Sequence, residues 1–149
     1  MSDNAAKILD RKSKIVLGVD DAQDNLNLLK LSVETAGYTF MGAKGGLECL
    51  RLVCRMIPKL ILLDIEMPGI DGFETCRRIR NLSETKLVPI AFLTGRKTAE
   101  DVKTGMAAGG NDFIVKPYDV VKLIERINHW VNRAPRTPVR DLEGTQRVG

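Results

Sequence analysis

The stretch Leu60-Ile-Leu-Leu-Asp64, near the middle of the chain, decides the fold class. Four consecutive apolar residues that stop at a carboxylate fit a strand buried on both faces, which is typical of a parallel sheet covered by helices. Runs of the same kind lie at Ile15–Val19 before Asp20, at 88–93 before Thr94 and at 113–115 before Lys116, with a weaker run at 38–41. We therefore expect five parallel strands.

Segments with apolar residues at helical spacing separate these runs. Leu26, Leu29, Val33 and Ala36 form one stripe. Further helical patterns lie at 47–54 and at 120–131 behind the predicted cap Asp119, and capping boxes begin at Asp71 and Thr98. Strands that alternate with helices predict a doubly wound α/β sandwich of five βα units, flavodoxin-like, with strand order 2-1-3-4-5.

Length and composition predict one domain. The chain has 149 residues, 44% apolar and 28% charged, and no apolar run approaches a membrane span. Its three cysteines lack a metal-binding spacing, so we expect free thiols in a reducing cytoplasm. The segments 1–13 and 134–149 carry no periodic apolar pattern. We expect them to be flexible, with the folded domain at 14–133.

The net charge of +4 does not point to nucleic acid. Residues 15–133 hold sixteen basic and fifteen acidic side chains, so most of the excess lies at the two ends. Nucleic-acid binding needs a basic patch on the fold itself, and we therefore expect none by the domain.

Polar side chains end four of the predicted strands. Because the first and third strands are neighbours in the order 2-1-3-4-5, Asp20, Asp21 and Asp64 should converge, with Thr94 and Lys116 on the far rim. At about 4 Å and an effective dielectric of ~20, each pair of carboxylates costs about 4 kcal/mol. A cation would relieve this repulsion. Oxygen ligands alone suit Mg²⁺, and Mn²⁺ is the alternative.

These residues also have a simpler reading, in which the acidic groups only cap helices, as Asp21 could cap a helix that starts near Ala22. The full set favours a phosphoryl site instead. Lys116 and a metal would offset charge on phosphoryl oxygens, and Thr94 would donate a hydrogen bond. Asp64 is then the candidate nucleophile, which would form an acyl phosphate.

The run Leu62-Leu-Asp-Ile-Glu-Met-Pro-Gly-Ile-Asp-Gly72 resembles the phosphorylation loop of bacterial response regulator receiver domains, and the resemblance extends over about residues 14–132. It is similar to the single-domain, chemotaxis-regulator type. The resemblance implies that Asp64 takes a phosphoryl group from a sensor histidine kinase or a histidine phosphotransfer protein. It also implies that Asp21, Asp64 and the backbone carbonyl of Glu66 bind Mg²⁺, while Asp20 acts mostly through water.

The same resemblance implies a switch. Thr94 would bond a phosphoryl oxygen, Phe113 would turn into the vacated space, and the Lys116–Pro117 bond would be cis. Partners would then bind the face of the fourth helix, fifth strand and fifth helix of the domain. The downstream target stays open, and no pattern supports a homodimer through this face, although that alternative also stays open. Such a protein catalyses only its own phosphorylation and dephosphorylation.

Glu66 and Arg96 each lie two positions past a site residue, and we hypothesise that they face each other as a partial lid that lengthens the phosphorylated lifetime. The competing interpretation is two solvated side chains.

Three other functions fit the sequence less well. A haloacid-dehalogenase-type phosphohydrolase requires a second Asp two residues after the first, where this chain has Glu66. A nucleotide-binding module wants a glycine motif that is missing. A scaffold that takes no phosphate would not need the complete site. No recognisable output domain follows residue 133, so we expect action through a partner, by passing the phosphoryl group on, or as a piece of a longer chain.

Overall fold

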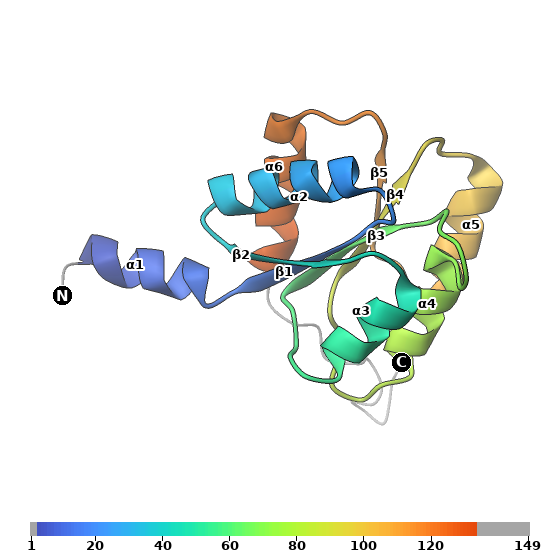
Figure 1. Ribbon diagram of the computed structural model, residues 1–149, viewed down its shortest axis with the longest axis horizontal. Coiled ribbons are helices and arrows are strands. Elements are labelled where there is room, and N and C mark those ends of the chain that lie inside the picture. Colours follow the sequence, from blue (N-terminus) through green and yellow to red (C-terminus); the bar gives the residue numbers. More distant parts are fainter. Residues whose placement is uncertain (1–2, 134–149) are drawn as a thin grey trace, which may run out of the picture.

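The computed structural model describes residues 3–133 and contains a five-stranded parallel sheet between two layers of helices (Figure 1). The strand order is β2-β1-β3-β4-β5, so the predicted flavodoxin-like α/β sandwich is confirmed. The strands are β1 (Ile15–Val19), β2 (Thr39–Ala43), β3 (Leu60–Asp64), β4 (Ile90–Thr94) and β5 (Asp112–Val115). The helices are α1 (Asp3–Lys12), α2 (Gln23–Thr35), α3 (Gly46–Val53), α4 (Gly72–Arg80), α5 (Ala99–Ala108) and α6 (Val120–Val131).

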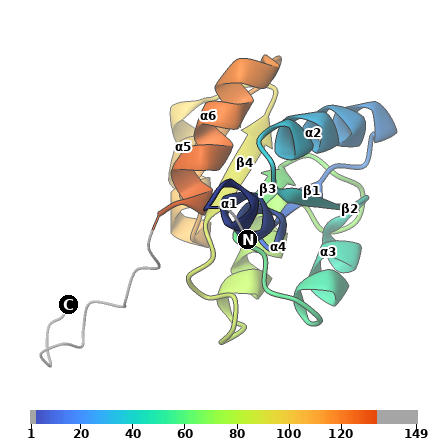
Figure 2. The same ribbon diagram turned by 90° about the vertical axis from the view of Figure 1, so that its left-hand side faces the viewer.

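Helices α2 and α6 cover one face of the sheet, and α3, α4 and α5 cover the other (Figures 1 and 2). Each face has its own buried apolar cluster, because the central strands β1, β3 and β4 are apolar on both sides. Three helices begin at the predicted caps: Asp71, Thr98 and Asp119 accept hydrogen bonds of 2.8, 3.0 and 2.7 Å from the backbone three residues on. No helix within residues 3–133 is long and apolar enough to cross a membrane.

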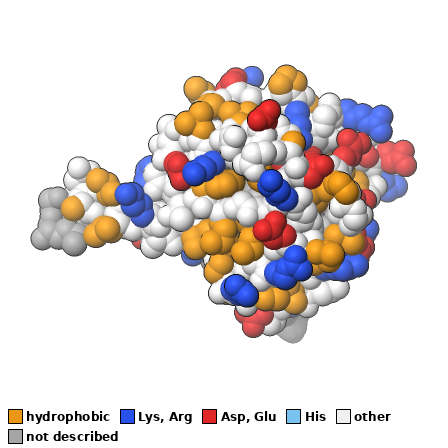
Figure 3. Space-filling view, viewed as in Figure 1, with side chains coloured by type: hydrophobic (Ala, Val, Ile, Leu, Met, Phe, Trp, Pro, Cys, Tyr) orange, Lys and Arg blue, Asp and Glu red, His pale blue; other side chains and the backbone are white. Residues whose placement is uncertain are grey.

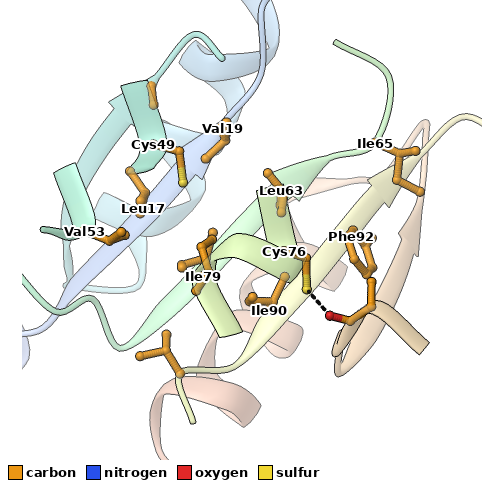
Figure 4. Close-up of a cluster of buried hydrophobic side chains, with 14 of the residues drawn as sticks. Leu17, Val19, Cys49, Val53, Leu63, Ile65, Cys76, Ile79, Ile90 and Phe92 are labelled. Atoms are coloured by element: carbon orange, nitrogen blue, oxygen red, sulfur yellow. Dashed lines mark hydrogen bonds between the residues drawn. The ribbon is translucent and has the colours of Figure 1, made fainter. Parts of the chain in front are cut away.

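The larger cluster packs α3 and α4 against the middle of the sheet (Figure 4). Cys49 and Cys76 are buried within it, and the Cys76 thiol donates a hydrogen bond to the carbonyl of Ala108 at 3.4 Å. Burial raises the pKa of Cys49 to about 12, which keeps it a neutral thiol. All three cysteines are free, as the sequence predicts.

The N-terminal segment 1–13, which is predicted to be flexible, contains a helix that the apolar pattern does not indicate. Helix α1 forms there and projects from the sheet (Figure 1), because its first turn is acidic, its last turn is basic and its middle holds good helix formers. Two hydrogen bonds tie it to the domain: Arg11 Nη1 donates to the carbonyl of Ala36 at 2.8 Å, and Thr39 Oγ1 donates to the carbonyl of Lys12 at 2.6 Å. The boundary at residue 14 stays a prediction, and the predicted tail 134–149 lies outside the described residues.

Gly18 lies in the middle of β1, where a larger apolar residue would strengthen the strand. The ring of Phe40, from the neighbouring strand β2, lies over this position. A Cβ on Gly18 would be 2.8 Å from Phe40 Cε1 and 3.0 Å from a methyl group of Leu29. The glycine is therefore required by packing.

Candidate phosphoryl-acceptor site

Three carboxylates gather at the carboxyl edge of the sheet. Asp64 is the last residue of β3, and Asp20 and Asp21 directly follow β1, which pairs with β3. One oxygen from each of the three lies within 4.8 Å of the others. Asp20 and Asp64 are buried, whereas Asp21 is exposed. The structure thus brings together the three acidic residues that the sequence analysis predicted.

Lys116 reaches two of these carboxylates from the end of β5. Its ammonium group lies 3.1 Å from Asp64 Oδ1 and 3.2 Å from Asp20 Oδ2. Its backbone N–H donates to the carbonyl of Thr94 at 2.7 Å, which ties the loop after β5 to the end of β4. The Lys116–Pro117 peptide bond is cis, as predicted.

The charges of this cluster are strongly coupled. Burial and the neighbouring Asp20 raise the pKa of Asp64 to about 6, against the opposing effect of the Lys116 hydrogen bond. The pKa of Lys116 is raised as well: burial lowers it, but the hydrogen bond to Asp64 and the two carboxylate charges outweigh burial. The pKa of Asp64 stays raised despite the neighbouring ammonium group. Lys116 alone therefore does not offset the negative charge of the cluster.

Asn25, in the first turn of α2, is a site residue that the sequence analysis missed. Its side-chain amide donates to both oxygens of Asp20, at 3.2 and 3.1 Å. The backbone N–H of Ala22 donates to Asp20 Oδ1 at 3.0 Å. The N-cap of α2 is Ala22 and no side chain caps this helix, so Asp21 does not act as the cap that the simpler interpretation of the sequence allowed. The only signal in the sequence was an amide side chain one helical turn after an acidic pair, which is too common to single out.

Thr94 ends β4 beside Asp64, since Leu93 pairs with Asp64 across the sheet. Its hydroxyl donates to the carbonyl of Arg96 at 2.6 Å and accepts from the Arg96 backbone N–H at 3.2 Å. The hydroxyl is thus held by the loop that follows β4. To bond a phosphoryl oxygen it has to leave these partners.

Phe113 lies in β5 and is 5% exposed. Its ring centroid lies 5.2 Å from that of Phe92, and its ring fills the space that a side chain on Gly105 of α5 would need. Phe113 is thus packed inward in this structure, between β4 and α5.

Glu66 and Arg96 are both exposed and border one hollow beside Thr94. The predicted facing pair is not formed: no ion pair joins Glu66 to Arg96 within residues 3–133, and Arg96 Nε instead lies 4.0 Å from Asp101 Oδ2. Because Glu66 and Arg96 each follow a site residue by two positions, the sequence could place both beside the site. It could not give the direction of the Arg96 side chain, which is 77% exposed.

The donor set fits a hard divalent cation. The cluster offers carboxylate oxygens only, without histidine or cysteine, and Asp21 is open to solvent. Mg²⁺ keeps several waters and binds through few protein carboxylates. This suits the exposed Asp21 and an Asp64 that accepts a hydrogen bond from Lys116 at one oxygen. Asp20 already accepts hydrogen bonds from Asn25, Ala22 and Lys116, whereas the exposed Asp21 has its oxygens open to solvent.

Comparison with known proteins identifies the family. The response regulator receiver domain profile matches residues 16–128, so the chain belongs to this family. A transcriptional regulatory protein of Bacillus subtilis, YrkP, is 43% identical over 112 residues, which are 75% of this chain and 47% of that protein. A 14.6 kDa protein of Leptolyngbya boryana is 35% identical over 115 residues, 77% of this chain and 88% of that protein. The matched part of this chain spans about half the length of YrkP and of the regulator RpaA of Synechocystis, and 25% of the length of the response regulator PleD of Caulobacter vibrioides.

Solved structures agree with this assignment. The chemotaxis protein CheY4 of Vibrio cholerae superposes with a TM-score of 0.76 at 29% identity, over 78% of this chain and 98% of that one. The receiver domain of the sensor histidine kinase PA1611 from Pseudomonas aeruginosa, which has a magnesium ion in its active-site cleft, gives a TM-score of 0.75 at 27% identity, over 80% and 98% of the two chains. Receiver domains accept phosphoryl groups from histidine kinases or phosphotransfer proteins and bind Mg²⁺ at an acidic pocket.

Proposed function

We propose that this protein is a phospho-acceptor of a two-component phosphorelay, in which the Asp64 carboxylate takes a phosphoryl group from a histidine kinase or a phosphotransfer protein. The observation that carries the proposal is the cluster of Asp20, Asp21, Asp64 and Lys116 at the edge of the sheet, with the Lys116 ammonium 3.1 Å from Asp64 Oδ1. A nucleophile, two further acidic groups and a cation in one place are the parts that phosphoryl transfer needs.

In this proposal an Asp64 oxygen attacks the phosphorus of a phosphohistidine. The new O–P bond forms as the P–N bond breaks, and the electron pair stays on the imidazole nitrogen, which takes a proton. Lys116 moves from Asp64 to an oxygen of the phosphoryl group and offsets its charge. Water later attacks the phosphorus, which restores the carboxylate and releases inorganic phosphate.

Mg²⁺ fits the same cluster. Asp21 and Asp64 would hold it, with the backbone carbonyl of Glu66 as the third protein ligand and Asp20 acting through water. Mn²⁺ would serve as an alternative, because it accepts the same oxygen ligands. When bound, the ion neutralises charge on the transferring group. Without it, the raised pKa of Asp64 leaves part of this carboxyl group protonated near neutral pH.

A partner protein would detect phosphorylation through Thr94 and the face formed by α5, β5 and α6. Thr94 would exchange its bonds to Arg96 for a phosphoryl oxygen, which would free the loop after β4. Phe113 already packs inward against Phe92, so the response would come from the loop and α5 rather than from a large movement of this ring. A partner that binds this face would then distinguish the two states.

The test is labelling of the full chain by acetyl phosphate, followed by intact mass. Wild type should gain one phosphoryl group in Mg²⁺ and none in EDTA, and Asp64→Asn should gain none. Asp10→Asn, which changes an exposed acidic residue of α1 outside the cluster, should be labelled like wild type. Labelling of Asp64→Asn, or none of wild type, would overturn the proposal. Steady turnover of small phosphate esters would indicate a hydrolase instead.

The lifetime of the acyl phosphate is a separate part of the proposal. Glu66 and Arg96 border the hollow beside Thr94, and Arg96 would have to leave Asp101 to close over the site. If it does so, Arg96→Ala shortens the half-life of the labelled protein. An unchanged half-life would mean that both side chains are merely solvated.

A further inference from the structure

We propose that Asn25 is a positioning residue that holds Asp20 and thereby releases Lys116 for the phosphoryl group. Asp20 is fully buried and accepts four hydrogen bonds: one from Ala22, two from the Asn25 amide and one from Lys116. Of these donors only Lys116 also contacts Asp64. The inference rests on the proposed function, in which Lys116 has to move.

The ammonium group of Lys116 is shared almost equally, at 3.2 Å from Asp20 and 3.1 Å from Asp64. When it turns toward a phosphoryl oxygen, Asp20 loses its cationic partner. A buried carboxylate that loses its donors is strongly disfavoured, so Asp20 would pull Lys116 back unless other donors remain. Asn25 and Ala22 are the donors that remain, and Asn25 is the only side chain among them.

The position of Asn25 suits this role because it does not depend on the phosphoryl group. It lies in the first turn of α2, one helical turn after Asp20, and its amide spans both carboxylate oxygens. Helix α2 is fixed by Leu26 and Leu29, which pack into the apolar cluster on that face of the sheet. The amide therefore stays in place while Lys116 changes partner.

Removal of the amide has two opposite consequences. The Asp20 carboxylate then keeps its charge but loses two hydrogen-bond donors next to Asp21 and Asp64, so we expect the cluster to bind Mg²⁺ more tightly. At the same time Asp20 holds Lys116 more firmly, so phosphoryl transfer at saturating Mg²⁺ becomes slower. We expect a change of about tenfold in each, which is the size typical for loss of a hydrogen bond to a charged group. A merely structural role would not tighten metal binding.

The experiment compares Asn25→Leu with Asn27→Leu in the full chain. Asn27 lies in the same helix, is exposed and has its side-chain oxygen bonded to Gln23 rather than to the site. Isothermal titration gives the Mg²⁺ dissociation constant, and acetyl phosphate labelling in saturating Mg²⁺ gives the rate. Asn25→Leu should bind Mg²⁺ more tightly and label more slowly, whereas Asn27→Leu should match wild type. Circular dichroism verifies that each variant is folded.

A double-mutant cycle with Asp20→Asn separates a direct effect from one through Asp20. In the Asp20→Asn background, Asn25→Leu should leave Mg²⁺ affinity unchanged, because the charge that it compensates is gone. An equal effect in both backgrounds, or an Asn25→Leu variant with wild-type affinity and rate, would overturn the inference. If wild type takes no phosphoryl group, the proposed function fails, while the Mg²⁺ titration still decides the role of Asn25.

Discussion

Replacement of the acceptor Asp64 by asparagine should stabilise the protein at neutral pH. Its carboxyl group is buried beside Asp20, and its pKa is raised from 3.8 to about 6. Between these two values the folded protein binds more protons than the unfolded chain, so the free energy of unfolding of wild type falls as pH rises through that window. Each pKa unit corresponds to about 1.4 kcal/mol, which gives about 2–3 kcal/mol at pH 7.

The amide of Asp64→Asn has a similar shape, can still accept from Lys116 and carries no charge to bury. Urea unfolding in EDTA, followed by circular dichroism, should therefore show the variant to be more stable than wild type by about 2–3 kcal/mol at pH 7. Below about pH 4 the difference in stability should vanish, because the protonated carboxyl group of wild type and the amide of the variant are then both neutral. Asp24→Asn, at an exposed position in α2, should differ from wild type by less than about 0.5 kcal/mol.

Addition of Mg²⁺ provides an internal check. Wild type should gain stability with Mg²⁺ concentration because the ion binds the folded state, and Asp64→Asn should gain much less. The reasoning is refuted if Asp64→Asn is neutral or destabilising at pH 7 in EDTA, since the buried charge would then cost nothing.

Three further outcomes follow from particular contacts. Arg80 donates to the carbonyls of Gly109, Thr85 and Val88, so Arg80→Met should lower the free energy of unfolding by about 3 kcal/mol in urea, and equality with the exposed Arg78→Met would contradict this. Gly18→Val should cost about 1–3 kcal/mol in the same assay because it meets the ring of Phe40, so a stabilised variant would show that packing does not require the glycine. Asp21→Asn should weaken Mg²⁺ binding at least about tenfold in a calorimetric titration, and wild-type affinity would remove Asp21 from the metal site.

The strands and the place of the site could be predicted from sequence because apolar runs mark the strands, and right-handed crossovers leave few topologies for five βα units. The pattern of Leu60–Asp64 and of Ile15–Val19 predicts strands without reference to any other residue. The first ends at Asp64, and Asp20 directly follows the second. Once the order 2-1-3-4-5 is chosen, the neighbouring strand ends have to meet. The convergence of Asp20, Asp21 and Asp64 followed from backbone topology alone.

Features that depend on side-chain direction could not be predicted in this way. The Asn25 amide bonds Asp20 only because α2 starts at a particular angle, and Arg96 turns to Asp101 although Glu66 has the opposite charge and a similar position. Helix α1 was missed for another reason. Its stability comes from alanines, dipole charges and two hydrogen bonds near its end. It leaves Ile8 and Leu9 exposed, so no buried stripe marks it in the sequence. Hydrophobic side chains are visible on the surface of this projecting helix (Figure 3).

The identity of the phosphorylated residue is the most direct test of this description. After labelling with acetyl phosphate and Mg²⁺, borohydride reduces an aspartyl phosphate to homoserine, and peptide mass spectrometry locates it. We predict homoserine at position 64 alone. Homoserine at position 20 or 21, or unmodified Asp64 in a labelled protein, would contradict the assignment of the acceptor and with it the arrangement of roles around the site.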